Sequence, residues 1–120
     1  MTPEEILSHP PRVLTQRQRE RYFEDGYLLV ESFVDADWLA RLKAGVQRLV
    51  DRSRQVTRSD AVFDLEPGHT AEKPRLRRVS SPNDEDAVFW DFASRSPLGD
   101  LLADVLGPHV KFHQSKLNFK

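Results

Sequence analysis

The chain has 120 residues, a formal net charge of −1 and no cysteine. The length fits one domain, and the lack of cysteine excludes disulfide frameworks, thiolate zinc sites and cysteine nucleophiles. No apolar run approaches the ~20 residues of a membrane span, and the acidic N-terminus is unlike a signal peptide. We therefore expect a cytoplasmic protein with no membrane partner. The only histidines that could bind a metal are His9, His69, His109 and His113.

The charges are spread evenly along the chain. Residues 1–60 carry 10 basic and 10 acidic side chains, and residues 61–120 carry 8 and 9. A protein that follows the phosphates of a nucleic acid needs a basic surface. The charge distribution therefore argues against a nucleic-acid partner.

Two capping patterns predict short helices over residues 3–7 and 16–25. In each pattern a threonine precedes the helix and a glutamate or glutamine follows three residues later, as in a capping box. Prolines end the first helix, and Gly26 ends the second. We expect residues 1–14 to be an N-terminal extension of the domain.

The middle of the chain alternates between β-rich and helical patterns. The apolar run at residues 27–34 predicts a buried strand. Asp35 then caps a long helix with one apolar stripe, which ends near Arg54. Short strands are predicted at residues 63–65 and in the basic segment 73–79.

Two more helices and a strand complete the chain. One helix begins at Ser81-Pro82, and the next runs from Ser96-Pro97 to Gly107-Pro108. Residues 110–120 have the pattern of a strand in which one face gathers amides and amines. Since helices and strands are mixed, the predicted class is α+β. The polar face consists, in its second half, of Gln114, Lys116, Asn118 and Lys120.

The strongest charge feature is a basic cluster of Lys73, Arg75, Arg77 and Arg78. An exposed strand with surface charge would explain it, and so would a site that binds carboxylate or phosphate. Strict alternation along a strand places Arg78 on the same face as Leu76. A half-buried Arg78 would need an anion, supplied either by the protein or by a ligand.

The histidines and acidic runs do not form a metal or acid–base motif. His109 and His113 have the i, i+4 spacing of a helical zinc site, but their segment reads as extended, which separates them by about 13 Å. We interpret His69 as a surface loop residue and His9 as part of a linker. The acidic run at residues 84–86 suits a helix start.

Three stretches of the chain follow one another in a characteristic order. The first, from Tyr22 to Leu42, is a helix, a glycine, a short strand and another helix. The second is Phe63-Asp64-Leu65-Glu66-Pro67-Gly68-His69-Thr70, which runs into Pro74-Arg75-Leu76-Arg77-Arg78-Val79. The third is Leu106-Gly107-Pro108-His109-Val110, followed by His113-Gln114-Ser115-Lys116-Leu117-Asn118-Phe119-Lys120. Together, over residues 15–120, they resemble the phytanoyl-CoA dioxygenase (PhyH-like) family of Fe(II)/2-oxoglutarate-dependent oxygenases, and the third is locally similar to ectoine hydroxylases.

The resemblance implies a double-stranded β-helix, or jelly roll, buttressed by N-terminal helices and incomplete in this chain. In that family an H-x-D motif and a distal histidine hold iron as a facial triad. No histidine here is followed by that pattern. We therefore expect residues 15–120 to be the N-terminal part of such a domain, which would continue beyond residue 120. The iron ligands would lie there, so the 120-residue chain alone would not bind iron and would be inactive.

The resemblance implies binding roles for three residues of this chain. Lys120 matches the family lysine that contacts the cosubstrate 2-oxoglutarate, and Arg78 matches a second basic cosubstrate contact. Gln114 matches the glutamine that contacts substrate in ectoine hydroxylases. Lys120 and Gln114 are six residues apart, an even separation that places them on the same side of a strand. Lys116 stands where relatives vary, which leaves the substrate open.

Two functions follow from these patterns. The first is the N-terminal part of a dioxygenase that hydroxylates a small-molecule substrate. The second is a stand-alone, non-catalytic module that binds an acidic metabolite through a basic groove. The sequence does not specify the oligomeric state or the stereochemistry of hydroxylation.

Overall fold

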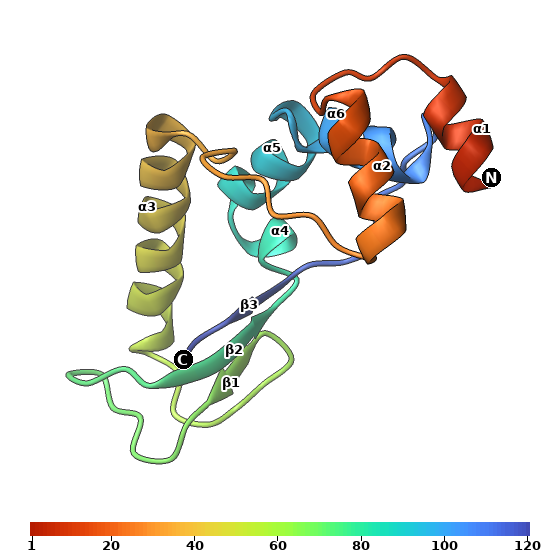
Figure 1. Ribbon diagram of the computed structural model, residues 1–120. Coiled ribbons are helices and arrows are strands. Elements are labelled where there is room, and N and C mark those ends of the chain that lie inside the picture. The colour runs from red at the N-terminus through yellow and green to blue at the C-terminus, as the bar shows by residue number, and fades with distance from the viewer. The chain divides into compact units, whose positions relative to one another are not determined.

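The computed structural model describes residues 1–120 as a mixture of helices and one small sheet (Figure 1). The predicted α+β class is confirmed. None of the helices combines the length and apolar character needed to cross a lipid bilayer. In chain order the elements are α1 (Pro3–Ser8), α2 (Gln16–Asp25), α3 (Ala36–Ser53), β1 (Phe63–Leu65), β2 (Leu76–Ser80), α4 (Pro82–Glu85), α5 (Ala87–Arg95), α6 (Leu98–Leu106) and β3 (Lys116–Asn118).

The chain divides into two compact units. The helical unit consists of Met1–Phe33 and Phe92–Phe112, and the sheet unit of Val34–Asp91 and His113–Lys120. Each unit has its own buried residues.

In the helical unit, α1, α2 and α6 pack against one another (Figure 1). Both predicted capping boxes are present: Thr2 accepts a hydrogen bond from the Glu5 amide at 3.2 Å, and Thr15 accepts one from the Gln18 amide at 3.1 Å. Gly26 ends α2 in the left-handed region, with φ of +82°. These local signals therefore predicted both helices correctly.

The strand predicted at residues 27–34 is wrong. The segment has no regular structure, and Tyr27 and Leu29 are 72% and 74% exposed. An apolar run becomes a strand only where a neighbouring strand pairs with its backbone. The strands of this chain pair only in the order β1-β2-β3, so none of them pairs with this run.

The sheet unit packs α3 and the three-stranded antiparallel sheet around one apolar cluster. Asp35 caps α3 as predicted, and its carboxylate accepts a hydrogen bond from the Trp38 amide at 2.8 Å. Gly45 is buried where α3 meets α5, at a point with no room for a side chain beside Val88. The core of the cluster consists of Leu49, Phe63, Leu76 and Val79.

A register shift in β2 corrects the predicted faces of the basic segment. Asp64 pairs with Arg78 and Leu65 with Leu76, so Arg77 is an extra residue without a partner, as in a β-bulge. The bulge interrupts the alternation of faces. Leu76 therefore joins Val79 in the core, and Arg78 does not share the face of Leu76 as predicted.

Two other predicted elements are shorter than expected. The helix that begins at Pro82 breaks at Asp86, whose backbone is extended and whose carboxylate accepts a hydrogen bond from the Val88 amide at 3.1 Å. This contact starts α5 as a separate helix. The predicted strand at 110–120 is confirmed only over Lys116–Asn118, the residues of β3 that form the ladder with residues 78–80 of β2.

Candidate functional site

One face of the sheet is polar, and Arg78 lies on it. In the ladder, Arg78 lies between Asp64 of β1 and Asn118 of β3, and Ser80 lies beside Lys116. Directly paired residues of an antiparallel sheet point to the same side, whereas Val79 and Leu117 point to the core. We call this the polar face; it consists of Asp64, Arg78, Ser80, Lys116 and Asn118.

Arg78 is half-buried on the polar face, and its nearest anion belongs to the protein. An Nη atom of Arg78 lies 3.7 Å from a carboxylate oxygen of Asp64. That separation is an ion pair rather than a hydrogen bond. The donors of the guanidinium therefore stay available to a second anion.

Gln114 precedes β3 in the chain and Lys120 follows it, and both residues are exposed. The Phe119 amide donates to the Arg77 carbonyl at 3.0 Å, so the pairing with β2 continues past Asn118. Alternation then places Lys120 on the side of the polar face. Because β3 begins at Lys116, the alternation does not extend to Gln114, whose role stays a prediction.

Arg77, the bulge residue, is held by two carboxylates. It donates to the two carboxylate oxygens of Glu66 at 3.2 and 3.4 Å, and it lies 3.7 Å from Asp64. The hydrogen bond to Glu66 first, and then the charges of Glu66 and Asp64, raise the pKa of Arg77 above its ordinary value. These contacts make Arg77 part of the protein's own charge network.

The His69 side chain links two backbone segments, whereas its place after a Pro-Gly turn had suggested only a surface loop residue. Its Nδ1 accepts a hydrogen bond from the Arg75 amide at 2.9 Å, so its Nε2 donates to the Ser53 carbonyl at 2.8 Å. Both ring nitrogens are therefore committed, which leaves none for a metal. Both partners are backbone groups, so no side-chain pattern in the sequence could have indicated them.

Iron does not fit the residues of this chain. No three histidine, cysteine, aspartate or glutamate side chains form a group that could hold a metal ion. An Fe(II) oxygenase site of the facial-triad type needs two histidines and a carboxylate.

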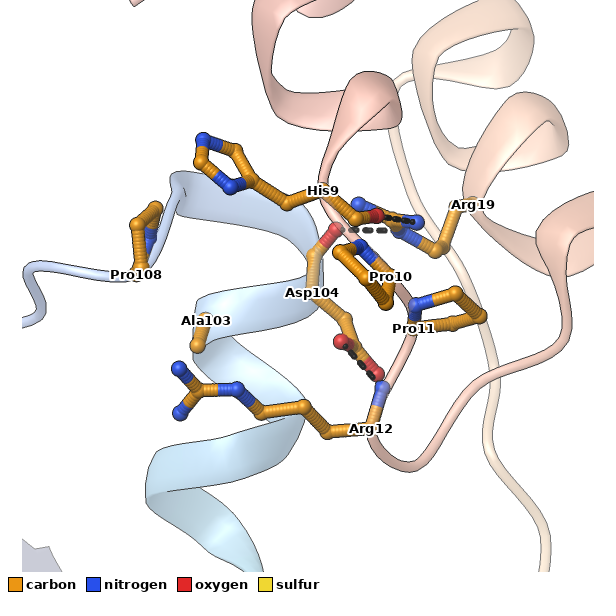
Figure 2. Close-up of a pocket in the computed structure, with 8 residues that line it drawn as sticks. All are labelled: His9, Pro10, Pro11, Arg12, Arg19, Ala103, Asp104 and Pro108. Atoms are coloured by element: carbon orange, nitrogen blue, oxygen red, sulfur yellow. Dashed lines mark hydrogen bonds between the residues drawn. The ribbon is translucent and has the colours of Figure 1, made fainter.

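A concave region in the helical unit surrounds Asp104 and Arg19 (Figure 2). It is a hollow of about 290 Å³, and Arg19 and Asp104 are 0% and 2% exposed. The Asp104 carboxylate accepts hydrogen bonds from the amides of residues 12, 13 and 14, each at 2.8 Å. Arg19 donates to three backbone carbonyls, those of Ile6, His9 and Asp104, and to the Gln16 side chain.

The charge of Asp104 is stabilised within the protein. Burial on its own raises the pKa of this carboxyl, but the three amide hydrogen bonds and the nearby Arg19 charge outweigh it and lower the pKa below the ordinary value. Every polar atom of the pair has a partner, since no buried side-chain nitrogen or oxygen lacks one. We therefore assign this hollow a structural role.

The sequence of the whole chain can be compared with known proteins. The chain matches the model of the phytanoyl-CoA dioxygenase (PhyH) family over residues 22–120. The chain belongs to this family. The resemblance found in the sequence is thus confirmed, and the PhyH match includes all of the polar face.

Curated relatives of this PhyH protein are dioxygenases. The chain is 28% identical over 108 residues to the probable alpha-ketoglutarate-dependent hypophosphite dioxygenase of Stutzerimonas stutzeri, a match that covers 90% of this chain and 37% of that protein. It is 28% identical over 107 residues to the ectoine dioxygenases of Bordetella parapertussis and Bordetella bronchiseptica, covering 89% of this chain and 33% of each. The chain thus spans about a third of the length of these relatives. No solved structure matches it.

Proposed function

We propose that residues 15–120 form the N-terminal part of a jelly-roll dioxygenase that uses Fe(II) and 2-oxoglutarate to hydroxylate a small-molecule substrate in the cytoplasm. The observation that carries the proposal is membership of the PhyH family over residues 22–120. The printed name of one relative, an alpha-ketoglutarate-dependent dioxygenase, supports the cosubstrate. Since this chain holds no metal-ligand group, the iron ligands would lie beyond residue 120.

In this proposal the polar face supplies the cationic side of the cosubstrate site. 2-Oxoglutarate is a dicarboxylate, so it needs positive partners. Lys120 and Arg78 would bind its charge, an interaction that strengthens where water is excluded. In an oxygenase of this class, iron and 2-oxoglutarate together supply the oxidising power. Gln114 would donate or accept a hydrogen bond at the substrate.

The alternative, a non-catalytic module with a basic groove, has less support. It requires that the basic cluster be available to a metabolite. Arg77, however, is engaged by Glu66 and Asp64. The family membership favours the dioxygenase as well.

The first test is succinate release by the full-length protein with Fe(II) and 2-oxoglutarate, using hypophosphite and ectoine as candidate substrates because relatives are named for them. We expect Lys120→Ala to raise the KM for 2-oxoglutarate about tenfold, since a charge-assisted contact is lost. Lys43→Ala, on the exposed surface of α3, is the matched control. An unchanged KM in Lys120→Ala would refute the role of Lys120.

A second test concerns the reading frame. An H-x-D motif within about a dozen codons after Lys120 is expected for the dioxygenase, whereas an immediate stop codon would favour the binding module. The chain 1–120 alone should release no succinate from 2-oxoglutarate. Fe(II)-dependent release by that chain would contradict the placement of the iron ligands.

A further inference from the structure

The polar face carries an excess of positive charge. Arg78 faces Asp64 at 3.7 Å, whereas Lys116 takes part in no ion pair. Six arginines of the sheet unit have an acidic partner within 4.0 Å, namely Arg41, Arg48, Arg52, Arg54, Arg77 and Arg78. Other cations of the unit, such as Lys43 and Arg75, have none, so the lack of a partner does not by itself distinguish Lys116. Its position does: the carboxylate of the polar face, that of Asp64, is already shared by Arg77 and Arg78. An ammonium on a face whose carboxylate is already shared by two arginines is a candidate for recognition of an external anion.

The backbone at Lys116 is held from two sides. In the ladder it pairs with Ser80 of β2. The preceding residue, Ser115, is fixed twice by the turn after β2: its carbonyl accepts from the Ser81 amide at 3.2 Å, and its hydroxyl donates to the Asn83 side chain at 2.5 Å.

The turn that makes these contacts is strained. Ser81 has φ of +48°, in the left-handed region, and it precedes Pro82, a position that disfavours helical conformations. The two Ser115 contacts depend on the course of this turn. The chain thus anchors the backbone from which the Lys116 side chain leaves, although the ammonium itself is exposed.

We propose that Lys116 determines the charge of the substrate, which therefore carries an anionic oxygen group such as a phosphorus oxyanion or a carboxylate. This rests on the proposed dioxygenase function, in which Lys120 and Arg78 serve the cosubstrate. Lys116 is then the cation left for the substrate, two residues from Gln114. An ammonium facing a neutral or cationic group in a closed site would lose hydration without compensation. A compact charge with three donors suits an anionic oxygen.

The test is calorimetric titration of the full-length protein, saturated with 2-oxoglutarate, using hypophosphite as the phosphorus oxyanion and acetate as the carboxylate. At least one anion should bind the wild type, and the stronger of the two identifies the source of the anionic group. Lys116→Gln should weaken that binding about tenfold or more, because a charged hydrogen bond is lost. Lys116→Arg should retain most of it because the charge is kept.

The controls separate this inference from general destabilisation and from the proposed function. Lys43→Gln removes an exposed lysine of α3 and should leave anion affinity unchanged. The thermal midpoint of Lys116→Gln should match that of the wild type. The inference is overturned if neither anion binds the wild type, or if Lys116→Gln binds as tightly. Succinate release, measured in parallel, reports on the dioxygenase chemistry independently of anion affinity.

Discussion

The helical unit buries a pair of charged side chains, whereas the sheet unit keeps its charges at the surface. In the helical unit, Arg19 and Asp104 are fully buried, and each is satisfied mainly by backbone groups. In the sheet unit six arginines pair with carboxylates at the surface, and Lys116 on the polar face has no acidic partner. A buried charge needs all of its partners at once, whereas an exposed one tolerates their absence. The first arrangement therefore contributes to stability and the second leaves charge available for binding.

The largest expected effect is at the buried pair. Asp104→Asn keeps the shape but turns an amide toward three backbone donors and removes the charge beside Arg19. We expect it to lower the free energy of unfolding by about 3 kcal/mol, measured by urea denaturation followed by circular dichroism.

Asp100→Asn is the matched control for that variant. It removes the exposed ion pair with Arg12 from the same helix. The change should stay within about 0.5 kcal/mol. Equal effects of the two variants would contradict the contrast between buried and exposed charge.

A smaller effect is expected where α3 approaches α5 in the sheet unit. Gly45→Ala would place its Cβ against Val88, so overpacking should cost about 1–3 kcal/mol and outweigh the gain in helix propensity. Gly99→Ala in α6, where a Cβ meets nothing, should instead stabilise the protein by about 0.5 kcal/mol. Thermal unfolding of both variants measures the difference. Stabilisation by Gly45→Ala would show that the two helices are not held at this separation.

The smallest effect concerns pH and again involves Asp104. Its pKa lies below the ordinary value of an aspartate, about 3.9. A depressed carboxyl pKa contributes stability that is complete above the unfolded pKa and is lost as the pH falls through the folded pKa. The stability difference between wild type and Asp104→Asn should therefore shrink below about pH 4. A difference that stays constant down to about pH 2 would exclude the linkage.

Other carboxyl groups of the protein also have a lowered pKa, so the pH dependence of the wild type must be compared with that of Asp104→Asn. The pKa of Asp86 is lowered by the hydrogen bond from Arg48, and that of Asp60 by the amides of Phe63 and Val62. Both lie in the sheet unit and are unaffected by a change at residue 104. Subtracting the variant's pH profile therefore isolates Asp104.

Local chemistry in the sequence predicted most helix boundaries. The two capping boxes, the cap at Asp35 and the stop at Gly26 involve residues no more than four positions apart, so their energetics are readable from the order of residues. Resemblance to a family predicted the PhyH assignment for the same reason: motif order is a property of the chain. The sequence by itself thus determined where helices begin and to which family the chain belongs.

Tertiary structure decided the features that depend on distant partners. The run at 27–34 had a strand pattern but no pairing strand, and the bulge at Arg77 reversed the predicted face of Arg78. Arg19 and Asp104 are 85 residues apart and meet through backbone atoms, as His69 meets Ser53 and Arg75. Pairing register and backbone partners are set by which segments come together in space. For that reason the polar face, with Lys116 unmatched on it, became visible only in the folded chain.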